Sequence, residues 1–260
     1  MDGPTQRCPD WLRVAYEYIA LYGGLLLFAL VCLAWSLPAA LLYPLLPPRL
    51  AAPLGRRAIM TGFRGYLFVL RVSGIVKCDL RVLDALRNER CLMIAPNHPA
   101  LIDVVLVASR LPRVTCIMKA DLWDNVLLGG GARLARYIRN DSTVNMVRLA
   151  AHELRSGGQL LVFPEGTRTT RKPVNEFKGG FALVAKKAGC AIQTVFIETN
   201  SPFLSKDRPL LRRTRFPVEY RVRLGRRFDP PDDVRLFVAE LERYYLQELA
   251  GHEPLGGSRE

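Results

Sequence analysis

The 260-residue sequence predicts an α/β protein with a mostly parallel central sheet flanked by helices, preceded by an N-terminal hydrophobic membrane helix or bent two-helix insert. Short apolar runs alternate with segments of helical spacing, which predicts the sheet and its helices. Residues 18–48 carry no charged side chain, which predicts the membrane segment. We therefore divide the chain into a membrane segment at 1–50, one folded domain at 51–250 and a disordered tail, rich in glycine and charge, at 251–260.

The membrane segment centres on Ile19–Leu37, which is nearly all apolar and meets the requirement of roughly 20 residues for crossing a bilayer. Prolines follow at positions 38, 44, 47 and 48, so a single spanning helix and a bent two-part insert in one leaflet both fit. A cleaved signal peptide fits less well, because the run exceeds a core of roughly 7–15 residues. Arginines at 49, 56, 57 and 64 outweigh those at 7 and 13, which predicts that the domain lies on the cytoplasmic face.

The folded domain opens with a basic amphipathic helix at Ala51–Val72, whose apolar stripe we expect to pack on the domain. Apolar runs predict strands near Gly74–Leu80, Cys91–Ala95, Val114–Met118, Gln159–Phe163, Ile192–Ile197 and Val218–Leu224. Helical spacing predicts helices at Leu122–Ile138, Thr143–Arg155, Gly180–Ala188 and Asp232–Leu249.

Cysteine and histidine usage argues against metal sites and disulfides. The six cysteines show no Cys-x-x-Cys spacing and several lie in apolar runs, so we expect reduced core residues. Only three histidines are present and they are far apart, so no metal site is expected.

The first informative motif is Asn97-His98-Pro99-Ala100-Leu101-Ile102-Asp103, which follows a predicted strand. Inside one helix, His98 and Asp103 would point roughly 140° apart. We therefore expect His98 to be the N-cap of a helix that starts at Pro99 and runs to Ser109, so that its ring folds back towards Asp103. A carboxylate so placed would orient the imidazole, leaving its other nitrogen to take a proton from a hydroxyl. A satisfied polar pair is the ordinary alternative.

The second motif is Phe163-Pro164-Glu165-Gly166-Thr167-Arg168-Thr169, which also follows a strand. Pro164 ends the strand and Gly166 permits a tight turn. Arg168 is suited to bidentate phosphate binding and Thr167 adds a hydroxyl, so the loop is a candidate anion site. It lacks the spacing of a Walker loop, and a purely structural turn is the alternative.

In this order the two motifs resemble those of the glycerolipid acyltransferase family, whose type member acylates 1-acyl-glycerol-3-phosphate; the resemblance covers roughly Leu92 to Ile197. It implies that 51–250 is an acyltransferase catalytic domain that moves a fatty acyl group to a hydroxyl of a lysophospholipid. The donor would be an acyl thioester of acyl carrier protein or coenzyme A, a co-substrate, with no resident cofactor. The resemblance makes His98 the general base and Asp103 its orienting partner. It assigns the acceptor's polar head and phosphate to Glu165, Gly166, Thr167 and Arg168.

Basic residues elsewhere match the family less closely. Lys119, at the end of a strand, matches a basic residue that the family often carries and would help to neutralise acceptor or donor; a solvated strand end is the alternative. The family's middle-motif arginine is displaced by one position, so either Arg136 or Arg139 would substitute for it, or the acceptor would lack the usual phosphate arrangement. The stretch Ile192–Ile197 also lacks the family's usual proline. The resemblance thus implies the base more firmly than the acceptor.

The formal net charge of +13 predicts an anionic partner. No nucleic-acid-binding motif is visible, so nucleic acid is not expected. Anionic membrane lipid, with coenzyme A or acidic acyl carrier protein, accounts for the charge better. The densest basic stretch, Lys206–Arg227, would face membrane or carrier, or form a solvated face. The alternatives to the main prediction are a lipid-binding scaffold that kept the fold, a hydrolase, and acylation of a non-glycerophosphate lipid. The sequence predicts no oligomeric state.

Overall fold

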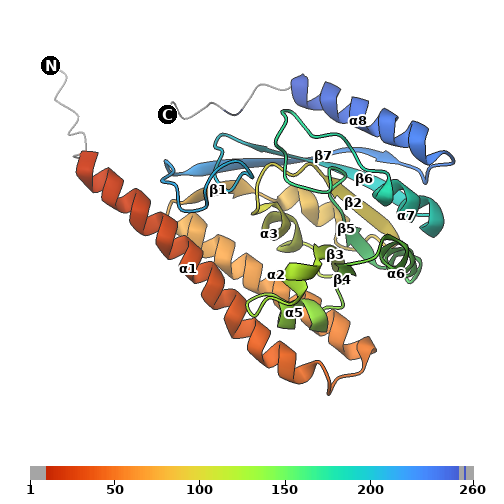
Figure 1. Cartoon of the computed structure of the whole chain (residues 1–260). Coiled ribbons are helices and arrows are strands. Elements are labelled where there is room, and N and C mark those ends of the chain that lie inside the picture. Colours follow the sequence, from red (N-terminus) through yellow and green to blue (C-terminus); the bar gives the residue numbers. More distant parts are fainter. Residues whose placement is uncertain (1–9, 252–254, 256–260) are drawn as a thin grey trace.

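Seven strands form one sheet with helices over both faces in the computed structural model, which describes residues 10–251 and 255 (Figure 1). The predicted tail therefore lies almost entirely outside the described residues. The strand order is β1-β7-β6-β2-β5-β3-β4. The strands span Val76–Asp79 (β1), Leu92–Pro96 (β2), Val114–Lys119 (β3), Ile138–Asn140 (β4), Gln159–Leu161 (β5), Ala191–Thr199 (β6) and Val218–Phe228 (β7). Among the strand pairs of the described residues, only β6–β7 is antiparallel, which confirms the mostly parallel sheet.

The central strand β2 shows why the sheet is covered on both faces. All five of its residues are buried. Leu92 and Ile94 belong to one hydrophobic core, and Met93 and Ala95 belong to the other. Because alternate side chains of a strand point to opposite faces, a continuous apolar run is what a strand buried on both faces requires.

Helices connect the parallel strands, so the carboxyl ends of β2, β5, β3 and β4 lie at one edge of the sheet. The connecting helices are α3 (Asp103–Ala108), α4 (Ala120–Trp123), α5 (Gly129–Leu134), α6 (Thr143–Arg155) and α7 (Gly180–Ala188). A short 3-10 helix (Arg81–Leu86) precedes β2, and α8 (Val234–Ala250) follows β7. The predicted bounds of α6 and α7 are confirmed.

The predicted helix at Leu122–Ile138 is wrong, because the chain instead forms α4, α5 and strand β4. The side chain of Asn125 accepts a hydrogen bond from Leu127 N at 2.8 Å, which favours a turn between the two helices. A Cβ at Gly130 would overlap the carbonyl oxygen of Ser36, so this position allows the close approach of α5 to the N-terminal helix.

The N-terminal segment forms two long helices that pack on each other (Figure 1). Helix α1 (Asp10–Leu42) is long and apolar enough to cross a membrane, and only 17% of its most apolar 18-residue window is buried. After a turn rich in proline, α2 (Pro48–Val72) runs back along it. The ring of Phe28 lies 6.2 Å from that of Phe63 and 5.3 Å from that of Tyr66. Phe63, Leu67 and Leu70 join the main core, which confirms that the stripe of α2 packs on the domain.

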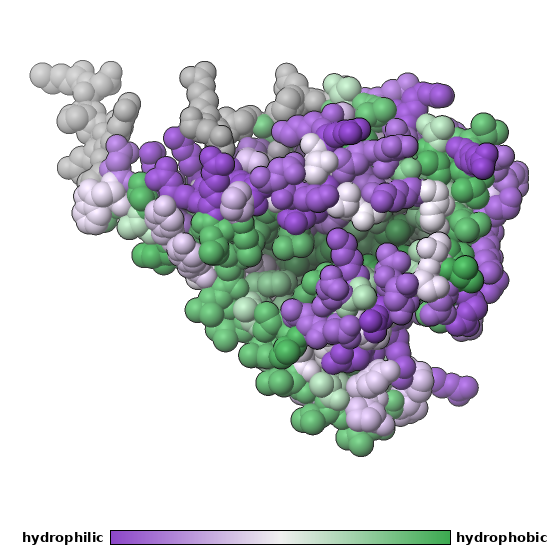
Figure 2. Space-filling model, in the orientation of Figure 1, coloured by the Kyte–Doolittle hydropathy of each residue, from purple (hydrophilic) through white to green (hydrophobic). Residues whose placement is uncertain are grey.

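Helix α1 leaves an apolar face uncovered. Its exposed hydrophobic residues recur at helical spacing: Trp11, Ile19, Tyr22, Leu26, Leu30, Leu37 and Leu41. Figure 2 shows a hydrophobic surface along this edge of the molecule. The opposite side of α1 contacts the domain near both ends, since Tyr16 donates to Ser73 O at 2.7 Å and Ser36 donates to Leu127 O at 2.5 Å. Thus α1 lies along the domain.

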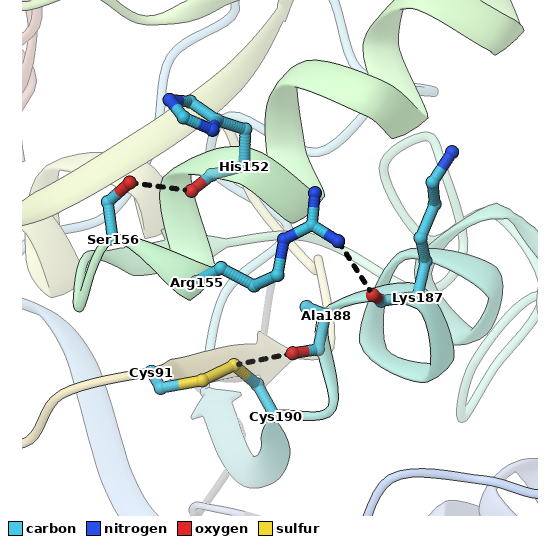
Figure 3. The surroundings of a disulfide bond; sticks show 7 residues. All are labelled: Cys91, His152, Arg155, Ser156, Lys187, Ala188 and Cys190. Atoms are coloured by element: carbon cyan, nitrogen blue, oxygen red, sulfur yellow. Dashed lines mark hydrogen bonds between the residues drawn. A yellow bond between two sulfur atoms is a disulfide. The ribbon is translucent and has the colours of Figure 1, made fainter.

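Cys91 and Cys190 form a disulfide, so the expectation of reduced cysteines is wrong for this pair (Figure 3). The two residues directly precede β2 and β6, whose parallel register pairs Leu92 with Ala191, and their Cα atoms are 5.3 Å apart. Nothing in the sequence indicates the pairing, because 99 positions separate the two cysteines. Cys32, Cys78 and Cys116 are free thiols, whereas Cys8 lies outside the described residues.

Candidate active site

Both sequence motifs lie at the carboxyl edge of the parallel strands. His98 follows β2, and Glu165 and Arg168 follow β5, its neighbour in the sheet. Lys119 ends β3, and Arg139 lies in the adjacent strand β4. Loops at this edge of an open α/β sheet commonly form binding sites. Strand topology therefore brings residues from four segments, far apart in sequence, to one edge.

His98 and Asp103 make the expected contact. The Nδ1 atom of His98 lies 2.9 Å from Oδ2 of Asp103, which is fully buried. The imidazole stacks on Phe163, with ring centroids 3.8 Å apart and an interplanar angle of 16°. The His98 side chain keeps 12% of its surface exposed, and its Nε2 makes no hydrogen bond within the described residues. The ring is thus fixed at one nitrogen and accessible for chemistry at the other.

The helix after His98 starts later than expected. Helix α3 begins at Asp103, so His98 is not its N-cap. Residues 99–102 form a separate turn, in which Asp103 Oδ2 accepts a hydrogen bond from Ala100 N at 2.8 Å. The same carboxylate oxygen therefore orders the turn and meets the imidazole. The inference that His98 must lie outside the helix is confirmed, but the turn achieves this instead of a cap.

The electrostatics of Asp103 are dominated by its environment. Burial raises the pKa of Asp103, and the hydrogen bonds from the His98 ring and Ala100 N–H oppose that rise. Because Asp103 is buried, its carboxylate interacts with the imidazole through a medium that screens charge less than water does. The carboxylate therefore orients the imidazole from inside the core.

Glu165 lies inside the protein, whereas the resemblance implies that it holds the acceptor's polar head. Its side chain is fully buried, and its carboxylate accepts three hydrogen bonds. Oε1 accepts from His98 N at 2.8 Å and from the Thr169 hydroxyl at 2.9 Å, and Oε2 accepts from Asn175 N at 2.8 Å. Thr169 N also donates to His98 O at 2.7 Å. Glu165 therefore joins the two motifs, and its carboxylate has no open side for an acceptor.

Asn97 is a site residue for which no role was predicted from the sequence. Its amide nitrogen donates to Ile197 O at 2.9 Å, and its amide oxygen accepts from Ile197 N at 2.7 Å. This reciprocal pair ties the end of β2 to β6, directly before His98. An asparagine after a buried strand signals only a turn, so its partner, 100 positions away, could not be found from sequence.

The turn at Gly166 places Arg168 against a distant loop. Gly166 has φ +67°, a conformation that favours glycine. One terminal nitrogen of Arg168 donates to Leu204 O at 2.9 Å and to Ser205 O at 3.0 Å. The other two nitrogens make no hydrogen bond within the described residues, and Thr167 is half-buried. Arg168 thus has a structural role and still has two nitrogens available.

The remaining predicted basic residues differ in their surroundings. Lys119 is exposed, with its Cα paired to that of Asn140 across the strands. Arg139 donates to Asp124 at 3.2 Å and lies 3.6 Å from an oxygen of Asp141, so carboxylates surround it. Arg136 stacks over the ring of Tyr43 at 4.8 Å. Of the three, Lys119 is the most open to a ligand.

Comparisons with known proteins agree with this geometry. Residues 77–198 match the family model described as Acyltransferase. The curated lyso-ornithine lipid O-acyltransferase of Pseudomonas aeruginosa is 29% identical over 153 residues, covering 54% of this chain and 58% of that relative. The crystal structure of the 1-acyl-sn-glycerophosphate (LPA) acyltransferase PlsC from Thermotoga maritima aligns with a TM-score of 0.61 at 19% identity, covering 94% of this chain and 99% of that chain. The fold is therefore shared with that enzyme.

Proposed function

Because residues 77–198 belong to the acyltransferase family, we propose that this protein transfers a fatty acyl group from an acyl thioester to a hydroxyl of a lysolipid, with His98 as general base. The observation that carries the proposal is the state of the imidazole. Oδ2 of Asp103 lies 2.9 Å from Nδ1 of His98. Nε2 of the same ring makes no hydrogen bond with the described residues, and the ring remains accessible. That arrangement suits removal of a proton from an incoming hydroxyl.

The chemistry requires no nucleophile from the protein. His98 Nε2 takes the hydroxyl proton as the acceptor oxygen bonds to the thioester carbonyl carbon. The tetrahedral adduct then collapses, which breaks the carbon–sulfur bond and releases a thiolate. The imidazolium, stabilised by Asp103, returns its proton to that thiolate, so the products are an ester and a free thiol. The donor is a co-substrate, acyl-coenzyme A or acyl carrier protein, and no resident cofactor takes part.

The acceptor's anionic group belongs beside Arg168. Its two available nitrogens, the Thr167 hydroxyl and the exposed ammonium group of Lys119 are the donors that this edge offers. Glu165 and Gly166 contribute by shaping the loop. A lysophospholipid such as 1-acyl-glycerol-3-phosphate is the acceptor that these donors favour.

A lysolipid without phosphate is the second candidate acceptor. The curated relative is named for a lyso-ornithine lipid. In this chain Arg139 lies among carboxylates and one nitrogen of Arg168 is bound to backbone, which leaves fewer guanidinium groups for a phosphate. An acceptor with a smaller anionic charge suits that arrangement.

The experiment offers the full-length protein in phospholipid vesicles a radiolabelled acyl thioester and a panel of lysolipids. The panel contains 1-acyl-glycerol-3-phosphate, lysophosphatidylcholine and lyso-ornithine lipid, each with coenzyme A or acyl carrier protein as the carrier. Label in one fully acylated lipid is the expected result, and it identifies acceptor and donor together. Release of labelled free fatty acid with every acceptor would make the protein a hydrolase, and no labelled product at all would make it a binding protein.

We place the catalytic domain on the cytoplasmic face of the membrane, from the excess of arginine after α1. Two of those arginines have structural partners as well: Arg56 pairs with Glu153 at 2.7 Å, and Arg64 donates to Ser109 O at 3.3 Å. Arg49 and Arg57 are exposed, so they support this placement directly.

A further inference from the structure

The connection between β6 and β7 contains a cavity of about 240 Å³ lined by arginines. Arg208, Arg212, Arg213 and Arg215 line it, together with Ser201 and Thr214. None of these six residues belongs to the two motifs of the candidate active site. Like charges gathered around one cavity repel each other unless anions lie among them.

Two of these residues have groups available for a ligand. The Thr214 side chain is buried, and its hydroxyl makes no hydrogen bond within the described residues. A buried hydroxyl without a partner costs stability, which a bound acceptor group would offset. The exposed guanidinium group of Arg212 likewise makes no hydrogen bond or ion pair with the described residues. A ligand that accepts hydrogen bonds and carries negative charge would use both groups.

The connection that contains the cavity contacts α1 on one side and the loops of the candidate active site on the other. Arg213 pairs at 3.3 Å with Glu17, a buried residue of α1, and Figure 1 shows this connection beside the N-terminal half of α1. On the other side, Leu204 O accepts hydrogen bonds from Arg168 and from Leu101 N, at 2.9 and 3.0 Å. The connection therefore links the N-terminal helix to both motifs.

The connection contacts α1 near its N-terminal end, where exposed tyrosines lie beside Glu17. Tyr18 and Tyr22 follow Glu17 along α1, stack at 6.2 Å and are exposed, as aromatic residues at a membrane interface are. We therefore expect this end of α1 to lie at the level of lipid headgroups. Figure 2 shows hydrophilic residues gathered beside this end of α1 and hydrophobic residues along the rest of that edge.

We propose that this cavity binds a phosphate group, carried by a lipid headgroup or by coenzyme A. Guanidinium groups bind phosphate through paired hydrogen bonds, and a threonine hydroxyl is a further donor. The volume is below the roughly 300–1,000 Å³ of pockets that enclose drug-sized molecules. The cavity therefore suits a headgroup or a phosphate, with the rest of the ligand outside.

The test measures binding in the full-length protein without turnover, so it does not depend on the proposed acyl transfer. One arm measures binding to phosphatidic acid vesicles over phosphatidylcholine vesicles, and the other measures binding of coenzyme A to the protein in an uncharged detergent. The variants are Arg212→Gln and the isosteric Thr214→Val. Arg235→Gln, which removes the same charge from the exposed face of α8, is the matched control.

In one arm, we expect Arg212→Gln to weaken binding on the order of tenfold and Thr214→Val severalfold, as for loss of a hydrogen bond to a charged group. Arg235→Gln should leave binding unchanged. An effect in the vesicle arm identifies a lipid headgroup, and an effect in the soluble arm identifies coenzyme A. If neither variant binds more weakly than wild type, the cavity is not a phosphate site. The same conclusion follows if Arg235→Gln weakens binding as much as Arg212→Gln does.

Discussion

At the scale of single residues, the site is organised by two buried carboxylates with different tasks. Asp103 holds the imidazole, and Glu165 holds the two loops together through His98 N, Thr169 and Asn175. The sequence predicted the contact of His98 with Asp103 because their spacing restricts the geometry. It could not separate a carboxylate that faces the acceptor from one that faces backbone N–H groups, because that difference depends on burial.

Replacing Glu165 with Gln tests its positioning role. An amide places an NH₂ group against donors, so at least one hydrogen bond is lost, at a cost of about 1–3 kcal/mol in the free energy of unfolding. We expect a lower kcat together with a lower midpoint of thermal unfolding, while Glu176→Gln, on an exposed side chain, changes neither. If the variant only raises the acceptor KM and leaves the midpoint of thermal unfolding unchanged, Glu165 binds the acceptor and does not position the loops.

Replacing Arg168 with Ala tests whether the arginine also binds the acceptor. The change removes the two available nitrogens and the contacts to Leu204 and Ser205. The acceptor KM should rise about tenfold or more, and the donor KM should change much less. Steady-state kinetics with each substrate varied in turn measures both. Equal changes for donor and acceptor would show that Arg168 acts only through the loop.

At the scale of elements, the sequence predicted helices well where helical spacing is regular, as in α6 and α7. It failed over residues 122–138, where tertiary contacts outweigh helical spacing. There α5 packs against α1 through Gly130, and Ile138 pairs with Ile117 in the sheet. Both contacts join segments distant in sequence, which local patterns do not report.

The N-cap of α8 predicts a dependence of stability on pH. Hydrogen bonds from Leu236 N and Arg235 N lower the pKa of Asp233. Its contribution to stability is therefore complete above the unfolded pKa of about 3.9 and is lost as pH falls through the lowered folded value. Asp233→Asn keeps a capping oxygen but no charge, so we expect it to be less stable than wild type near neutrality, with the difference shrinking below about pH 4. Thermal unfolding across this range measures it, with Asp229→Asn as control. A stability difference between Asp233→Asn and wild type that does not change with pH would contradict the role of Asp233 as a charged N-cap.

The disulfide between the starts of β2 and β6 predicts a dependence on reductant. Closing a loop of this length restricts the unfolded chain, so reduction should lower the free energy of unfolding by about 2–4 kcal/mol. Thermal unfolding with and without reductant measures the change. The double variant Cys91→Ala/Cys190→Ala should show the lowered midpoint and no further response, whereas Cys78→Ala should respond as wild type does. Alkylation of both cysteines in the unreduced, unfolded protein would contradict the bond.

At the scale of the whole molecule, α1 and α2 form one unit with the domain. Contacts at Tyr16 and Ser36, near opposite ends of α1, hold it along the domain, and its apolar stripe faces outward. The sequence left a spanning helix and a one-leaflet insert open. The contacts at both ends favour the insert, because a helix crossing the bilayer would carry one of them away from the domain.

Labelling with a membrane-impermeant maleimide distinguishes the two arrangements. Asp10→Cys and Leu45→Cys place thiols near opposite ends of α1, and the unsubstituted protein gives the background. For an insert, both positions should react from the same face of sealed vesicles, the cytoplasmic one if the arginine count decides the orientation. The disulfide instead favours a domain that faces an oxidising compartment. The face from which the thiols react therefore shows whether the arginine count or the disulfide indicates the correct side of the membrane. Reaction from opposite faces would establish a spanning helix.

The most direct test of the central claim is the rate of acyl transfer after replacement of His98. In vesicles that hold equal amounts of folded protein, His98→Ala is compared with wild type and with His152→Ala, which removes an exposed histidine from α6. General base catalysis predicts a loss of about 10²–10⁴-fold in kcat for His98→Ala and none for His152→Ala. A His98→Ala rate within a few fold of wild type would contradict the account.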